Sequence, residues 1–66
     1  MEQYEYIFRW YTSVNGEVIL QTEKHIYASE LNEAKRQVEK EWPALKISEA
    51  HIERVKGNGT TEPLPI

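Results

Sequence analysis

Between residues 4 and 12 every second side chain is aromatic: Tyr4, Tyr6, Phe8 and Trp10. An Asn15-Gly16 turn signal follows, and residues 17–28 form a second strand-like run. Alternation with a period of two, followed by a turn signal, predicts a β-hairpin with one buried face. In a chain of 66 residues, one hairpin and one helix account for nearly all the structure that can form.

The register of this hairpin follows from burial. A two-residue turn would pair Val14 with Glu17 and mix apolar and charged side chains on each face. A three-residue loop, with Gly16 in the left-handed region as a G1 bulge, pairs Ser13 with Glu17 and Trp10 with Leu20 instead. Because a one-residue shift exchanges the faces of a strand, burial favours the three-residue loop. It predicts one buried face made of Tyr4, Tyr6, Phe8, Trp10, Val18, Leu20, Ile26 and Ala28.

A helix is expected after the hairpin, with Ser29 as its N-cap. Apolar side chains recur at spacings of three or four residues and form one stripe. Pro43 sets the end of the helix, since the residue before a proline avoids the helical region. The stripe consists of Leu31, Ala34, Val38 and Trp42.

Residues 49–56 alternate again, with Ala50 and Ile52 on one side, and predict a third strand. Residues 57–66 are too poor in packing groups to offset the entropy of ordering them, so a flexible C-terminal tail is expected there. The predicted fold class is therefore α+β: a two-layer β-β-α-β domain over residues 1–56, with a three-stranded antiparallel sheet and one helix packed on one face.

Composition argues against several classes of protein. The net charge is −3, from eleven acidic and eight basic residues that are interleaved, whereas a duplex-binding protein concentrates its cations on one face. Cysteine is absent, which fits a reducing cytoplasm. No apolar stretch exceeds three residues and the N-terminus lacks the regions of a signal peptide, so a cytoplasmic protein without a membrane span is expected.

No motif for chemistry is present. His25 and His51 are the only histidines, and they lack the spacing of metal ligands; we interpret both as surface residues near Glu5, Glu23 or Glu53. Ser13, Ser29 and Ser48 stand at a turn, a cap and a strand entry, where hydroxyls satisfy backbone groups. We therefore expect no enzyme, no cofactor and no metal.

The sheet face opposite the helix is the more informative surface. The predicted register places Ile7, Tyr11, Ile19 and Tyr27 there, surrounded by Arg9, Gln21, Glu23 and His25. Tyr, Ile and Arg within a polar rim are typical of protein-binding patches, although scattered outward apolar residues also occur as ordinary cross-strand packing. An unpaired outer strand edge is a second candidate surface, open to β-augmentation or dimerisation.

Three segments carry a family resemblance: Ile26-Tyr27-Ala28, Leu31-x-Glu33-Ala34 and Glu53-Arg54-Val55-Lys56. Over residues 26–56 the chain resembles the small podovirus proteins that inhibit host RNA polymerase, and some anti-CRISPR proteins of similar topology. The aromatic first strand has no counterpart in that family. The resemblance implies a hairpin, a helix and a third strand whose basic side chains, here Arg54 and Lys56, contact the polymerase.

These observations lead to one functional hypothesis and two alternatives. The first is a small non-enzymatic phage-type protein that binds and inhibits or adapts a bacterial host protein complex, with Ile7, Arg9, Tyr11, Ile19, Tyr27, Arg54 and Lys56 as candidate contacts. A structural homodimer or assembly subunit is the second, and a nucleic-acid-binding module the third.

Overall fold

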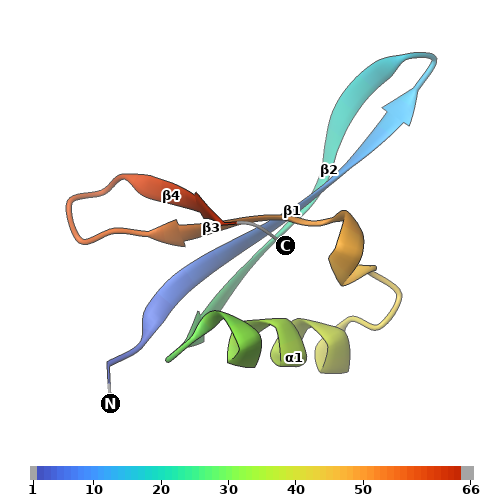
Figure 1. The fold of residues 1–66 in the computed structure, drawn as a ribbon. Coiled ribbons are helices and arrows are strands. Elements are labelled where there is room, and N and C mark those ends of the chain that lie inside the picture. Colours follow the sequence, from blue (N-terminus) through green and yellow to red (C-terminus); the bar gives the residue numbers. More distant parts are fainter. Residues whose placement is uncertain (1, 65–66) are drawn as a thin grey trace.

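The computed structural model describes residues 2–64, which form one helix on one face of an antiparallel sheet (Figure 1). The strand order is β2-β1-β3-β4, so β1 and β3 lie inside the sheet. The fold is thus α+β, as predicted. In chain order the elements are β1 (Tyr4–Val14), β2 (Glu17–Ala28), α1 (Leu31–Glu41), the short 3-10 helix η1 (Ile47–Glu49), β3 (His51–Val55) and β4 (Thr61–Leu64).

The sheet has four strands, and the prediction of three strands with a flexible tail over residues 57–66 is wrong. β4 pairs antiparallel with β3, placing Leu64 opposite Ile52. A tight turn joins the two strands: Gly59 has a φ of 85°, and the Lys56 amide donates to the Thr60 carbonyl oxygen at 2.8 Å. Leu64 packs against the core, which supplies the burial that the local composition did not suggest. Pro65 and Ile66 lie outside the described residues.

The hairpin turn is also different from the prediction. Asn15 (φ 53°) and Gly16 (φ 83°) form a two-residue turn, and Val14 pairs with Glu17. Two positive φ angles are what a type I′ turn requires, and Asn-Gly meets that requirement best. The bulge lies deeper in the hairpin: Tyr11 pairs with Leu20 but Trp10 pairs with Thr22, which leaves Gln21 as the extra residue of β2.

This bulge divides the hairpin into two parts. On the far side from the turn, Tyr6 pairs with Ile26 and Tyr4 with Ala28, so the even-numbered residues of both strands share the helix side of the sheet, as predicted. On the turn side the bulge exchanges the faces of β2, so its odd-numbered residues lie on the helix side and its even-numbered residues on the opposite side. Val18 therefore pairs with Ser13 and is exposed, and its predicted place on the buried face is wrong.

The core lies between α1 and the even-numbered side chains of β1. Phe8, Ala34 and Val38 are completely buried, and Leu31 and Trp42 pack at the margin, which confirms the apolar stripe of the helix. The helix ends before Pro43, as expected. The buried core comprises Tyr6, Phe8, Trp10, Ile26, Ala28, Ala34, Val38, Ala50 and Ile52.

The N-terminus of the helix departs from the prediction. Glu30, not Ser29, occupies the N-cap position, and its side chain makes no capping hydrogen bond. The Ser29 hydroxyl donates to Glu33 Oε2 at 2.6 Å, and the Ser29 amide donates to the same oxygen at 3.2 Å. These bonds lower the pKa of Glu33, first through the hydroxyl and then through the backbone amide. The first turn is thus fixed by the carboxylate that reaches back to Ser29.

The turn end of the hairpin extends beyond the helix and beyond β3 (Figure 1). β3 pairs with β1 only over residues 6–9, so β1 continues for five residues with β2 as its single described neighbour. We call residues 10–20 the hairpin arm. None of the helices within residues 2–64 has the length and apolar character needed to cross a bilayer.

The role of β4 can be tested with Leu64→Ala. Because Leu64 packs against the buried cluster, its truncation should lower the free energy of unfolding by about 1–2 kcal/mol. Urea denaturation followed by tryptophan fluorescence measures this change. Val18→Ala, at an exposed apolar position, is the control and should leave stability nearly unchanged. Equal stability of the Leu64→Ala variant and the wild type would indicate a tail rather than a strand.

Candidate protein-binding face

The face of the sheet opposite α1 has no covering element among the described residues (Figure 1). Successive side chains of a strand point to opposite faces, so the odd-numbered residues of β1 are directed here. The odd-numbered residues of β3, and those of β2 beyond the bulge, point to the same face. Ile7 pairs with both His25 and Glu53, and directly paired residues share a face. We call this surface the open face; its central residues are Glu5, Ile7, Arg9, Glu23, His25, Tyr27, His51 and Glu53.

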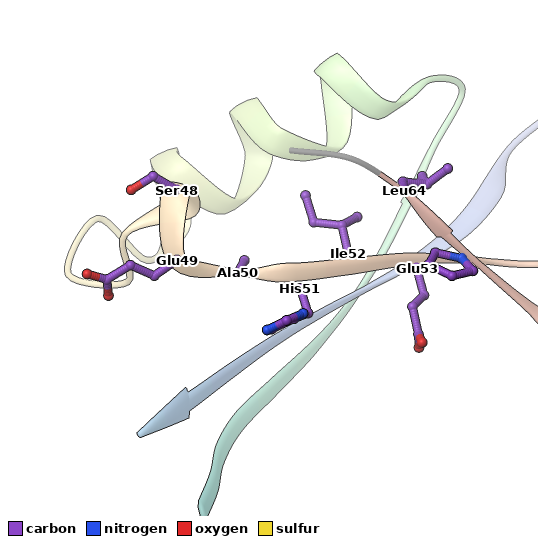
Figure 2. Close-up of a pocket in the computed structure, with 8 residues that line it drawn as sticks. Ser48, Glu49, Ala50, His51, Ile52, Glu53 and Leu64 are labelled. Carbon is purple, nitrogen blue, oxygen red and sulfur yellow. The ribbon is translucent and has the colours of Figure 1, made fainter. Parts of the chain in front are cut away.

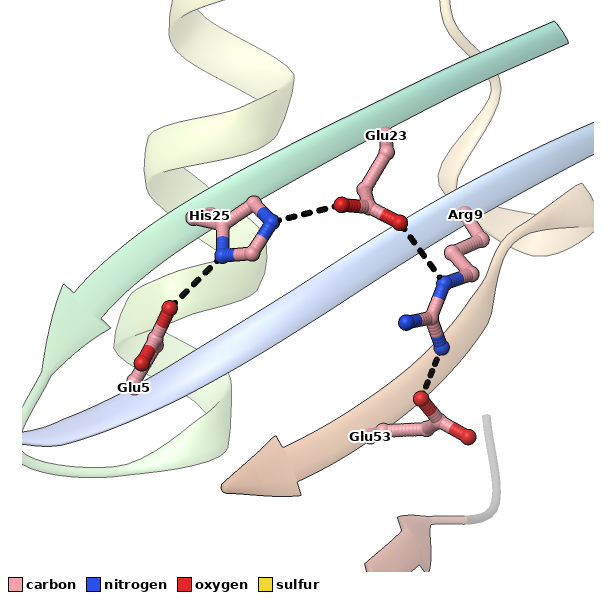
Figure 3. Close-up of polar contacts among 5 residues, drawn as sticks. All are labelled: Glu5, Arg9, Glu23, His25 and Glu53. Atoms are coloured by element: carbon pink, nitrogen blue, oxygen red, sulfur yellow. Dashed lines mark hydrogen bonds and ion pairs between the residues drawn. The ribbon is translucent and has the colours of Figure 1, made fainter. Parts of the chain in front are cut away.

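A continuous chain of ion pairs runs across the open face and joins three strands (Figure 3). His25 Nδ1 lies 2.6 Å from Glu5 Oε2, and His25 Nε2 lies 2.7 Å from Glu23 Oε2. The other oxygen of Glu23 accepts from Arg9 Nε at 2.9 Å. Arg9 Nη1 then donates to Glu53 of β3. We call these five residues the ion-pair chain.

The register of the strands explains how the ion-pair chain forms. Arg9 stands directly opposite Glu23 in the ladder between β1 and β2, and opposite His51 in the ladder between β1 and β3. Glu53 is two residues from His51 on the same face, within reach of the long Arg9 side chain. A guanidinium presents several donors in a fixed plane and can therefore bridge carboxylates on both neighbouring strands.

Ile7 lies at the centre of the ion-pair chain. Only 6% of its surface is exposed, although it points away from the helix. Its cross-strand neighbours are His25 and Glu53, and Glu5 and Arg9 flank it along β1. The carbon stems of these charged residues cover the isoleucine while their polar ends stay at the surface. Ile7, which the sequence suggested as an exposed contact, is therefore a buried residue beneath a charged layer.

The close contacts within the ion-pair chain shift the pKa values of His25 and Glu23. A neutral imidazole has only one N–H, but both ring nitrogens of His25 face carboxylate oxygens, so the geometry favours the imidazolium. The hydrogen bonds to Glu5 and then to Glu23 raise the pKa of His25. The pKa of Glu23 is lowered, first by His25 and then by Arg9. Glu23 thus holds a negative charge between two cations.

Two tyrosines flank the ion-pair chain and are well exposed. Tyr27 is 59% exposed and Tyr11 is 43% exposed. The Tyr11 ring packs edge-on against the ring of His51, with 5.1 Å between the centroids, which restricts its orientation. The open face therefore presents large aromatic groups at its two ends and fixed charges between them.

The other predicted contacts lie elsewhere. Ile19 pairs with Thr12 on the turn side of the bulge, so it belongs to the opposite face and not beside Tyr11 as expected. Arg54 shares the helix side with Ile52; its guanidinium lies over the ring of Tyr4 and 3.4 Å from a Glu62 oxygen. Lys56 contacts the other oxygen of Glu62 at 3.5 Å. The structure brings Arg9 and Ile7 together between Tyr11 and Tyr27, but not Ile19, Arg54 or Lys56.

The groove between β3 and β4 does not bring polar side chains together. A shallow groove of about 370 Å³ lies where β3 meets β4 (Figure 2). Figure 2 shows Ile52 and Leu64 on one side of β3, with His51 and Glu53 directed to the other side, so the polar groups do not converge. Over residues 2–64, no cluster of three or more His, Cys, Asp or Glu side chains is placed to hold a metal ion.

Comparison with known proteins gives no relative: the chain matches no protein-family model, no curated protein and no solved structure.

The ion-pair chain predicts how stability depends on pH. The pKa of His25 is raised above its ordinary value of 6.5, so its contribution is complete below about pH 6.5 and is lost as the pH rises through the folded-state pKa. The pKa of Glu23 is lowered below 4.5, so its contribution is complete above about pH 4.5 and is lost as the pH falls further. Urea unfolding across pH should give maximal stability between these two values.

His25→Gln isolates the histidine contribution, because glutamine does not titrate. The variant should lose the decline in stability that the wild type shows above about pH 6.5, while keeping the decline at acid pH that arises from glutamates. Parallel stability profiles of the two proteins above pH 6.5 would show that His25 does not hold its proton through Glu5 and Glu23.

Proposed function

We propose that the protein is a non-enzymatic binding protein of the phage inhibitor or adaptor type, which docks on a bacterial protein complex through the open face of its sheet. One observation supports this most: Tyr11 and Tyr27 are exposed on a sheet face that no helix of residues 2–64 covers, at the two ends of a fixed ion-pair chain. Tyrosine and arginine are enriched at protein interfaces, where an aromatic ring supplies large contact area and its hydroxyl a hydrogen bond.

Pre-organisation supports a binding role further. Side chains that must be ordered on association cost free energy, whereas the charges of the open face are already held by one another. Arg9 and Glu23 each contact two partners within the chain. A partner can therefore meet a fixed pattern of charge with little further loss of side-chain freedom.

The chemistry of His25 favours binding over catalysis. A general base needs a free ring nitrogen within reach of substrate, but both nitrogens of His25 contact carboxylates. The bonds to Glu5 and Glu23 raise the pKa of His25 and so favour its protonated form, whereas a general base must be unprotonated to accept a proton. The ion-pair chain thus acts as a surface element that positions charge.

The phage-type part of the proposal rests on the resemblance over residues 26–56. In that resemblance Arg54 and Lys56 correspond to the polymerase-contacting positions, but here both contact Glu62 of β4. Paired cations are less available to a partner than the aromatic groups of the open face. The same pairing disfavours the nucleic-acid alternative, because Arg9, Arg54 and Lys56 all lie beside glutamates.

The proposal is tested by comparing Tyr27→Ala with Tyr4→Ala. Both tyrosines are exposed, Tyr4 at 38%, but they lie on opposite faces of the same end of the hairpin. Immobilised wild-type protein is incubated with bacterial lysate, and the retained complex is identified and quantified by mass spectrometry. Tyr27→Ala should reduce retention by about tenfold or more, as expected for an interface anchor, with an unchanged urea midpoint. Tyr4→Ala should retain the complex.

Two results would contradict the proposal. One is equal retention by the Tyr27→Ala and wild-type proteins, which would move the contact away from the open face. The other is capture of nucleic acid with a steep dependence on salt and no retained protein complex, which would favour the nucleic-acid-binding alternative.

A further inference from the structure

The hairpin arm has a free strand edge that the proposed function does not use. β1 pairs with β3 over residues 6–9 only, so within the described chain no strand lies beside residues 10–14 on that side. Val14 is 50% exposed, and Val18 and Ile19 of the same arm are also exposed. Unpaired backbone groups beside exposed apolar side chains are the usual template for pairing with another strand.

The other edges of the sheet are protected. β4 is an outer strand of four residues that contains Pro63, which lacks a backbone N–H. The outer edge of β2 carries Glu17, Glu23 and Lys24, and the uncharged stretch between them is interrupted by the bulge at Gln21, which disturbs a regular edge. Short strands, prolines and charges are the devices by which proteins prevent edge pairing. Residues 10–14 have none of them: the segment is Trp-Tyr-Thr-Ser-Val.

This segment is compatible with pairing to itself. In an antiparallel arrangement with a twofold axis at Thr12, residue 10 stands opposite residue 14 of the second copy, and residue 11 opposite residue 13. In every pair both residue numbers are even or both are odd, so the two side chains point to the same face. The helices of the two copies therefore lie on the same side of the joined sheet. No like charges meet, because the segment has none. The arm of the second copy would lie beside residues 10–14 of β1, which β3 does not reach because it begins at His51, opposite Arg9.

The base of the arm also offers a place for Val14 of the second copy. A cavity of about 270 Å³ adjoins the arm there. Its lining combines apolar and polar groups: Trp10, Tyr11 and Thr12 of β1, Thr22 of β2, and Ala44, Leu45, Lys46 and Glu49 of the segment after the helix. The twofold arrangement directs Val14 of the second copy toward Trp10 on this same side of the sheet. Two such contacts form at once, since the interface is isologous.

We propose that the free edge of β1 over residues 10–14 pairs with the same edge of a second copy of this chain, with each Val14 seated in the cavity at the base of the other arm. Self-pairing uses the backbone edge of β1 and shares only Tyr11 with the open face, whose Tyr27 and ion-pair chain lie outside residues 10–14. Loss of the dimer in a Thr12 variant that still retains the lysate complex therefore separates a failure of self-pairing from a failure of the proposed function. A contact of five residues per strand buries little area, so the dimer should be weak and dependent on concentration.

Charged substitutions at Thr12 test the twofold axis directly, because Thr12 of one copy would face Thr12 of the other. Sedimentation velocity across a wide concentration range should show a monomer–dimer equilibrium for the wild type. Thr12→Lys and Thr12→Glu should each raise the dimer dissociation constant about tenfold or more, because like charges then face each other across the axis. An equimolar mixture of the two variants should recover dimerisation. The same substitutions at Thr61 of β4 are the controls and should leave the dimer unchanged.

Thr12→Cys gives a second readout with a smaller change of side chain. The sequence has no cysteine, so a single thiol can form only an intermolecular disulfide. Directly opposed strand residues have Cα atoms within disulfide range, so mild oxidation should give a covalent dimer. Thr61→Cys should stay monomeric. A wild type that is monomeric at all concentrations, or a Thr12→Cys protein that cross-links no better than Thr61→Cys, would overturn the proposal. So would a mixture that fails to recover, which would point to a strand of another protein as the occupant.

Discussion

The structure depends on β1, a central strand whose alternating side chains serve two different surfaces. Its even-numbered residues, Phe8 above all, fill the core beneath α1. Its odd-numbered residues, Ile7 and Arg9, form the middle of the open face. Because side chains alternate with a period of two, a shift of β1 by one residue would exchange the two surfaces. The position of the core therefore fixes the position of the candidate site.

No element of residues 2–64 covers the open face, and the ion-pair chain takes the place of a second layer there. A sheet covered on one side only would leave Ile7 in contact with water, but the ion-pair chain covers it. Individual surface ion pairs contribute little free energy, since their attraction is screened and their side chains lose entropy. The more important effect is order, because Glu5 and Arg9 of β1, Glu23 and His25 of β2 and Glu53 of β3 restrict one another. A fixed, partly apolar and partly charged surface is suited to recognition.

Much of this architecture could be predicted from local patterns. The aromatic alternation gave the correct faces for Tyr6, Phe8 and Trp10, and the apolar stripe and Pro43 placed the helix. The predicted register paired Trp10 with Leu20, and the true partner is Thr22. Since this error is two residues, the faces beyond the bulge were still correct. Near the turn they were not, because a bulge at Gln21 leaves no local signal, and Ile19 was assigned to the wrong face for that reason.

The remaining differences arise from contacts between distant residues. β4 contains only four residues and a proline, and its stability comes from pairing with β3 and from Leu64 on the core. Burial of Ile7 depends on charged residues from three strands, which no single segment reveals. For the candidate site, Arg9, Tyr11 and Tyr27 could be named from the sequence, but the chain that links Arg9 to Glu53 required the third strand in its true register.

The division of β1 between two faces is tested most directly by nuclear Overhauser effects in solution. The account predicts contacts from the Phe8 ring to the methyl groups of Ala34 or Val38, and from the Ile7 methyl groups to the His25 ring on the other side of the sheet. Contacts between Ile7 and Val38, with Phe8 beside His25, would show that the two faces are reversed and would contradict the account.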